Sequence, residues 1–136
     1  MGSLIFIDTS AFVAILAGED DADHYLAAIK SAKERCTGAH VRLECGINLA
    51  RLIKAELNRA EALFDRFLEM MSIAVVPITD DVSKSAVQAF SRFGKGRGHP
   101  AQLNFGDCLS YGCAAEHGAA ILFKGRDFIH TDLELA

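Results

Sequence analysis

Short apolar runs alternate with stretches of helical periodicity along this 136-residue chain. The first run, residues 4–7, is entirely apolar and is followed directly by Asp8, a pattern typical of a strand buried on both faces of a parallel sheet. Residues 73–78, which are rich in β-branched side chains, and the apolar residues 120–123 predict two further strands. Because strands separated by helices are joined by crossover connections, this order predicts an α/β domain with a mostly parallel sheet.

The segments between these strands predict helices and one more strand. Thr9 and Ser10 are expected to cap a first helix over 11–19. Apolar residues spaced three or four apart indicate helices over 23–33, 41–52, 63–71 and 82–93, and a short strand is expected near 35–37. A last helix begins at the NFGD motif, residues 104–107. No linker, repeat or low-complexity segment interrupts the order, so residues 1–136 are expected to form a single three-layer α/β/α domain.

Composition limits the function classes. Hydrophobic residues make up 51% of the chain, enough for a core of its own. The longest apolar runs are about eight residues, whereas a membrane span requires roughly 20, and Asp8 interrupts the only segment resembling a signal peptide. We therefore expect no membrane association and a cytoplasmic location. The four cysteines lack C-x-x-C and zinc-finger spacing, which favours buried, reduced thiols.

Four acidic residues are expected at one edge of the sheet. Asp8 follows the first strand, Asp127 lies just beyond the last, and Asp107 heads the helix that precedes that last strand. Ligands of open α/β sheets bind outside the carboxyl ends of the strands. Glu44 lies between Val41 and Ile47 in the third helix, which predicts a carboxylate at the edge of a core-facing stripe.

Each of these acids has a simpler explanation on its own. Asp8 is explained by a helix cap or an Asx turn. Glu44 is explained by an ion pair with Arg42, Arg51 or a distant base, and Asp107 and Asp127 by the preference for acids at helix starts. Four carboxylates at one edge, however, would raise one another's pKa and oppose folding, and a hard divalent cation is the usual remedy. Together they predict a Mg²⁺ or Mn²⁺ pocket.

Four motifs in this order resemble those of PIN-domain ribonucleases of the VapC type, the toxins of bacterial toxin–antitoxin pairs. They are FIDTSA at the start, Glu44 early in the third helix, LNFGDCLSY, and LFKGRDFIHTDL. The resemblance covers nearly the whole chain. It implies a PIN-like fold, a Mg²⁺- or Mn²⁺-dependent endoribonuclease, a homodimer, and inhibition by a VapB-type antitoxin. By motif it assigns the family's four acids to Asp8, Glu44, Asp107 and Asp127, with Asp132 as a possible accessory acid.

The chemistry of phosphodiester hydrolysis fits this assignment. Metal ions lower the pKa of an attacking water and neutralise the charge that develops on the phosphate oxygens, and the sequence suggests no Ser-His-Asp or Cys-His arrangement that would supply a protein nucleophile. We assign Asp8 and Asp107 as principal metal ligands, and Glu44 and Asp127 as ligands of a second ion or orienters of the water. Direct water attack predicts 3′-hydroxyl and 5′-phosphate ends.

The formal net charge of −4 argues against a nucleic-acid partner only at first sight. Without the four pocket acids the remainder is neutral. The 25 residues between Asp81 and Asp107 contain no acid and four bases. Within them, residues 94–100 (GKGRGHP) predict a mobile loop, whose Lys95 and Arg97 are expected to bind RNA phosphates; from charge alone it is a solvated surface loop.

Two other functions remain compatible with the sequence. A haloacid-dehalogenase-like phosphatase also begins with a strand and an Asp, but it requires a second Asp two positions later, where this chain has Ser10. A non-catalytic binding module on an α/β scaffold leaves the convergence of four acids unexplained.

Overall fold

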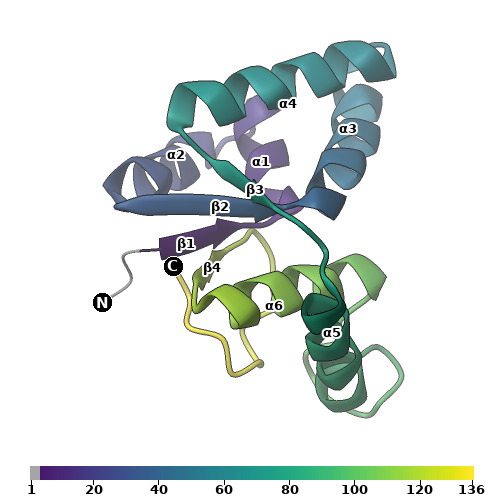
Figure 1. Ribbon diagram of the computed structural model, residues 1–136. Coiled ribbons are helices and arrows are strands. Elements are labelled where there is room, and N and C mark those ends of the chain that lie inside the picture. Colours follow the sequence, from purple (N-terminus) through teal and green to yellow (C-terminus); the bar gives the residue numbers. More distant parts are fainter. Residues whose placement is uncertain (1–3) are drawn as a thin grey trace.

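The computed structural model describes residues 4–136 and contains alternating strands and helices (Figure 1). In chain order they are β1 (Leu4–Ile7), α1 (Thr9–Leu16), α2 (Ala22–Ser31), β2 (Glu34–Gly38), α3 (Ala39–Ile53), α4 (Leu57–Met71), β3 (Ala74–Val76), α5 (Asp80–Phe93), α6 (Phe105–His117) and β4 (Ala120–Leu122). Every element expected from the sequence is present, with ends shifted by a few residues.

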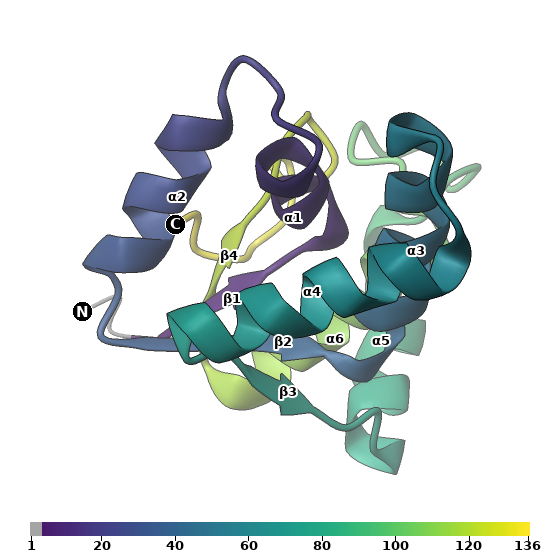
Figure 2. The ribbon, with the colours of Figure 1, turned by 90° about the horizontal axis from the view of Figure 1, so that it is seen from above.

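The four strands form one parallel sheet in the order β3-β2-β1-β4. Helices α1–α4 cover one face of the sheet and α5 and α6 cover the other (Figure 1). Seen from above, α1 lies between α2 and α3, and it contacts both (Figure 2). The three-layer α/β/α architecture with a parallel central sheet is therefore confirmed.

The strand order places a crevice beside β1. From β1 the chain crosses over one face to β2 on one side, whereas it returns through α5 and α6 to β4 on the other side. Between β1 and β4 the direction of winding reverses, and the carboxyl ends of two such strands form the usual ligand site of an open α/β sheet. Asp8 lies at this point, and its backbone N–H donates to Leu122 O at 3.0 Å.

The core lies on both faces of the central strands. Its largest fully buried side chains include Phe6 of β1, Phe12 of α1, Phe64 of α4 and Phe128 after β4. All four cysteines are buried and free, as predicted. None of the helices within residues 4–136 has the length and apolar character needed to cross a membrane.

Several local expectations are wrong. Asp8, not Thr9 or Ser10, caps α1. The strand expected over 73–78 is confined to Ala74–Val76, since Pro77 has no N–H for the sheet. Three apolar residues expected on core-facing stripes are exposed instead: Ile47 of α3 by 52%, Leu52 of α3 by 44% and Phe90 of α5 by 43%.

Candidate active site

Five acidic side chains line one cavity at the carboxyl ends of β1 and β4: Glu19, which pairs with Lys124, and the four acids predicted from the sequence. The cavity has a volume of about 430 Å³. The four predicted acids come from the end of β1, from α3, from the start of α6 and from the segment after β4. They are Asp8, Glu44, Asp107 and Asp127, and the structure thus brings together all four acids that the sequence placed at this edge.

Asp8 is held through both carboxylate oxygens and is only 6% exposed. Its Oδ2 accepts hydrogen bonds from the Ser10 backbone N–H at 3.1 Å and from the Ser10 hydroxyl at 2.7 Å. Its Oδ1 accepts from the Ser110 hydroxyl at 2.9 Å. The Ser10 hydroxyl also accepts from the Lys124 backbone N–H at 2.8 Å, which ties the segment after β4 to this carboxylate. Asp8 therefore caps α1 and also lines the cavity.

Glu44 reaches the cavity because Gly106 has no side chain. The Thr9 hydroxyl donates to Glu44 Oε1 at 2.8 Å, while a Cβ built on Gly106 would overlap Glu44 Oε2. Burial raises the pKa of Glu44, the Thr9 hydrogen bond opposes this, and the charge of Asp8 adds to the increase. The glycine of the NFGD motif is thus what allows α3 to place a carboxylate against the start of α6.

Asp107 is both a capping residue and a buried acid. The Asn104 side chain accepts from the Asp107 backbone N–H at 2.9 Å, and the Asp107 carboxylate accepts from the Asn104 backbone N–H at 3.1 Å, which completes a capping box. The pKa of Asp107 is raised to about 7, chiefly by burial. The charges of Asp127, Asp8 and Glu44 contribute to this increase, whereas the Asn104 hydrogen bond opposes it.

The cluster has no protein cation that neutralises it. The pKa of Asp127 is raised by burial and by the charge of Asp8. Within residues 4–136, none of the four acids forms a salt bridge with a lysine, arginine or histidine. Lys124, which lines the same cavity, binds Glu19 at 2.8 Å and Asp21 at 3.1 Å instead. The free carboxylates therefore repel one another, and a bound cation would relieve this repulsion.

The donor set suits a hard divalent cation, because every ionisable donor in the cluster is a carboxylate oxygen. As they stand, however, no three His, Cys, Asp or Glu side chains of the described chain, residues 4–136, are arranged as a finished metal site. Both carboxylate oxygens of Asp8, and Oε1 of Glu44, accept hydrogen bonds from hydroxyl groups. The carboxylate oxygens are suitable ligands for a divalent ion, but the side chains must move to coordinate it.

Arg51, considered from the sequence only as an ion-pair partner of Glu44, is a cavity residue that was not predicted as part of the site. It follows Glu44 by seven residues on α3, with Asn48 between them, and all three line the cavity. Spacing of four and seven residues places side chains on one helical face, so this signal was present in the sequence. Arg51 forms no salt bridge with another residue of the described chain.

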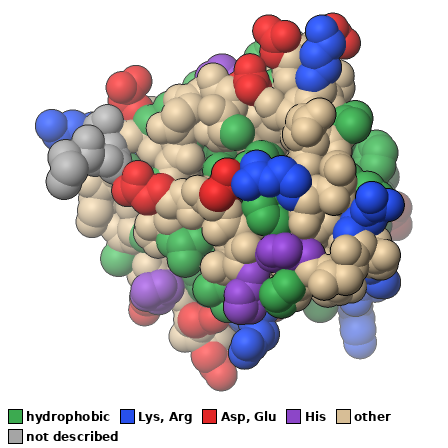
Figure 3. All heavy atoms as spheres, turned by 90° about the horizontal axis from the view of Figure 1, so that it is seen from below, with side chains coloured by type: hydrophobic (Ala, Val, Ile, Leu, Met, Phe, Trp, Pro, Cys, Tyr) green, Lys and Arg blue, Asp and Glu red, His purple; other side chains and the backbone are tan. Residues whose placement is uncertain are grey.

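The remaining sequence candidates lie outside the cavity lining. Lys95 and Arg97 are exposed in the turns after α5, and the Lys95 N–H donates to Leu103 O at 2.8 Å. Asp132 accepts from the Tyr111 hydroxyl and pairs with Arg92 at 3.2 Å, so its pKa is lowered. On the face formed by α5 and α6, acidic, basic and histidine side chains are interspersed, without one large patch of either sign (Figure 3).

A histidine, a serine and an aspartate do come together, contrary to the sequence-based expectation. His40 Nε2 lies 2.9 Å from Ser110 Oγ, which donates to Asp8. Ser110 stands between the other two residues and is fully buried, so its hydroxyl cannot reach a phosphodiester. The group is not a nucleophilic triad.

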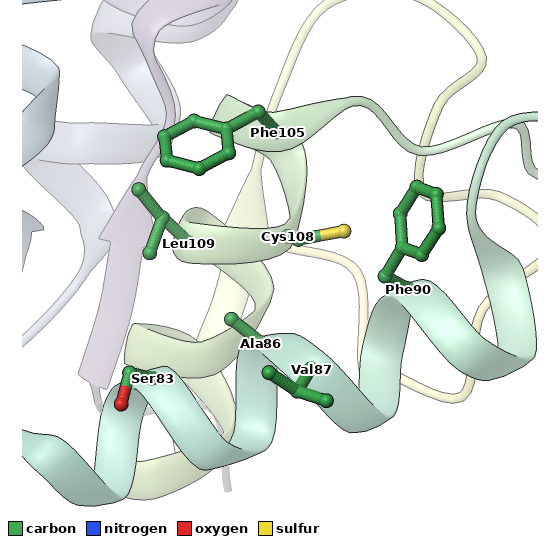
Figure 4. A pocket seen from close by; sticks show the side chains of 7 residues that line it. All are labelled: Ser83, Ala86, Val87, Phe90, Phe105, Cys108 and Leu109. Atoms are coloured by element: carbon green, nitrogen blue, oxygen red, sulfur yellow. The ribbon is translucent and has the colours of Figure 1, made fainter.

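A second cavity, of about 480 Å³, lies between α5 and α6. The side chains that line it are labelled in Figure 4 and include Val87, Phe90, Phe105 and Leu109. None of its lining residues is an acid, a base or a histidine. This cavity therefore lacks the groups needed for acid–base or metal chemistry, and the acidic cavity is the candidate active site.

Comparison with known proteins identifies the family. The PIN domain model matches residues 5–134. Ribonuclease VapC28 of Mycobacterium tuberculosis is 42% identical over 132 residues, which cover 97% of each chain.

Solved structures agree in fold. The crystal structure of Mycobacterium tuberculosis VapC20, described as a sarcin-ricin loop cleaving toxin, has a TM-score of 0.76 at 20% identity and covers 97% of this chain and 98% of its own. VapBC2 from Rickettsia felis, bound to a promoter DNA fragment, has a TM-score of 0.73 at 12% identity, covering 98% and 97%. This chain therefore belongs to the PIN-domain family, in the group whose curated members are named VapC ribonucleases.

Proposed function

We propose that this chain is a Mg²⁺- or Mn²⁺-dependent endoribonuclease, the toxin of a toxin–antitoxin pair, that hydrolyses RNA to 3′-hydroxyl and 5′-phosphate ends. The observation that carries the proposal is the convergence on one cavity of four carboxylates, none of which forms a salt bridge within residues 4–136. The ribonuclease names of relatives at 42% identity support the substrate class. The phosphatase alternative is wrong, because Ser10 serves as a donor to Asp8 and the chain is a PIN domain.

The chain's own residues have separate tasks in this proposal. Asp8 and Asp107 are the principal ligands, while Glu44 and Asp127 bind a second ion or orient the attacking water. When bound, the metal lowers the pKa of that water and neutralises charge on the phosphate. Thr9 fixes Glu44 through its hydrogen bond, so that this carboxylate is already oriented when RNA arrives.

Purified protein incubated with a single-stranded RNA tests the proposal. Cleavage is expected with Mg²⁺ or Mn²⁺ and none with EDTA, and the products should accept a 3′ ligation without phosphatase treatment. Asp8→Asn and Asp107→Asn should lose cleavage by orders of magnitude while remaining folded. Undiminished cleavage in EDTA, or by the folded Asp8→Asn variant, would exclude the metal mechanism.

RNA phosphates are bound by two sets of bases in this proposal. Arg51 lies in the cavity and contacts the phosphate next to the scissile bond, whereas Lys95 and Arg97 contact phosphates farther along the strand. For Lys95→Ala/Arg97→Ala, the slope of log K against log salt should fall by up to roughly 1.4 to 1.8, and turnover at saturating RNA should change little. Lys84→Ala is the matched control, because Lys84 is exposed and, among residues 4–136, pairs only with Asp80. An unchanged slope would leave residues 94–100 as a solvated loop.

The proposed partners are a VapB-type antitoxin and a second copy of the chain. Of the structures that share this fold, one is titled a toxin–antitoxin complex from Klebsiella pneumoniae and another is titled VapBC2 from Rickettsia felis. Induced expression in a bacterium should arrest growth, Asp8→Asn should not, and co-expression of a small protein encoded next to this gene should restore growth. Light scattering on the purified chain tests the dimer, and a monomer at micromolar concentration would refute it.

A further inference from the structure

A buried hydrogen-bonded chain leads from α3 through α6 to Asp8. His40, the second residue of α3, places Nε2 2.9 Å from Ser110 Oγ in α6, and Ser110 donates to Asp8 Oδ1 at 2.9 Å. Ser110 is fully buried, and His40 is half-buried with its ring stacked parallel to Phe6 at 6.5 Å between centroids. Neither residue lines the acidic cavity, so this hydrogen-bonded chain reaches Asp8 from the protein interior and not from the cavity.

The protons in this chain are fixed by the hydrogen bonds. Ser110 has a single hydroxyl proton, and the bond to Asp8 uses it. His40 Nε2 must therefore donate, since the reverse arrangement would place two acceptors against each other. His40 Nδ1 is buried and has no hydrogen-bond partner among residues 4–136, which favours the ring form with its only proton on Nε2.

Space for the histidine is provided by a glycine. A Cβ on Gly38 would lie 2.6 Å from His40 Cε1 and 2.7 Å from His40 Nδ1. Gly38 is the N-cap of α3 and the last residue of β2. The ring is therefore clamped between the β2–α3 junction and Phe6, and its Nε2 has one direction in which to donate.

We propose that His40 is a positioning residue for the nuclease reaction: by donating to Ser110 it directs the Ser110 hydroxyl onto Asp8 Oδ1 and fixes the orientation in which Asp8 faces the cavity. This inference rests on the proposed function. A donor that is itself a hydrogen-bond acceptor is polarised and becomes stronger. Partners of this kind behind a metal-binding carboxylate typically change metal affinity or activity about 10- to 100-fold.

A double-mutant cycle with a rescue variant tests this role. His40→Leu keeps the volume but removes the donor, Ser110→Ala removes the link, and His40→Gln restores an N–H at the position of Nε2. We expect kcat to fall at least about fivefold in His40→Leu and more in Ser110→Ala, with KM for RNA unchanged. His40→Leu should have no further effect in the Ser110→Ala background, because His40 acts only through Ser110.

Mn²⁺ affinity, followed by electron paramagnetic resonance of free Mn²⁺, gives a readout besides activity and should weaken in parallel with kcat. His40→Gln should return both quantities to within about threefold of the wild type. His117→Gln, an exposed histidine on α6, is the matched control and should change neither. If His40→Leu does not fold, as judged by circular dichroism, His40→Gln and Ser110→Ala carry the test.

The outcomes separate this inference from the proposed function. A wild type without metal-dependent cleavage refutes the function itself. With an active wild type, the inference is overturned if His40→Leu keeps kcat and Mn²⁺ affinity within twofold, if its effect multiplies with that of Ser110→Ala, or if His40→Gln is as impaired as His40→Leu, which would indicate that the ring serves packing alone.

Discussion

Replacing Asp107 with Asn should stabilise the metal-free protein at pH 8. The pKa of Asp107 is raised from 3.8 to about 7 by burial and by three neighbouring carboxylates. Each pKa unit corresponds to about 1.4 kcal/mol, so ionised Asp107 opposes folding by up to about 4 kcal/mol. An amide in its place carries no charge and can still accept the hydrogen bond from the Asn104 N–H.

The effect has a defined pH dependence. Below about pH 4, Asp107 is protonated in the folded and the unfolded chain, and it contributes no penalty. Between about pH 4 and 7 the folded protein retains a proton that the unfolded chain has lost, so wild-type stability falls as pH rises. Above pH 7 the loss is complete. The advantage of Asp107→Asn should therefore be near zero at pH 4 and largest at pH 8.

Thermal unfolding in EDTA, followed by calorimetry from pH 4 to 8.5, measures this difference. A domain of this size gains roughly 3 to 4 °C in Tm per kcal/mol, and burying an amide offsets part of the gain, so we expect Asp107→Asn to melt roughly 7 °C higher at pH 8. Asp81→Asn, at an exposed position in the first turn of α5, is the control and should not melt higher than the wild type at pH 8. This account of the cluster would be refuted if Asp107→Asn melts no higher than the wild type at pH 8, or if it melts higher by the same margin at every pH.

Three further outcomes are expected. Mg²⁺ or Mn²⁺ should raise the Tm of the wild type by mass action and leave that of Asp107→Asn nearly unchanged, as titration of the metal into melts will show; equal shifts would place the ion elsewhere. Gly106→Ala should displace the Glu44 carboxylate and reduce cleavage by at least about tenfold, whereas Gly46→Ala, whose Cβ would meet only Leu57 at 3.4 Å, should retain activity; equal cleavage rates for the two alanine variants would contradict the role of Gly106. Arg51→Ala should raise KM for RNA more than it lowers kcat in steady-state cleavage, and an unchanged KM would exclude Arg51 from phosphate binding.

The order and type of the elements were determined by the sequence itself, because they follow from local patterns. Alternating apolar runs and helical stripes required a parallel sheet, and a parallel sheet gathers the carboxyl ends of its strands at one edge. Asp8 and Asp107 were placed correctly for that reason: one follows a strand directly, and the other begins a helix entering the same edge. Some element ends also follow from residue type: Pro77 restricts the backbone directly after β3 and so marks the end of that strand.

Long-range packing decided what local patterns leave open. Ile47 was predicted to lie beside Glu44 on a core-facing stripe of α3, yet Ile47 is exposed. Glu44 extends instead into the space left by the absent side chain of Gly106, which only the folded structure reveals. The link from His40 to Ser110 joins residues 70 positions apart, and no spacing rule connects them. A pKa near 7 for Asp107 likewise depends on charges and burial supplied by α3 and by the segments after β1 and β4. Burial and electrostatic coupling are properties of surfaces that meet only after folding, and for this reason the tertiary structure alone revealed them.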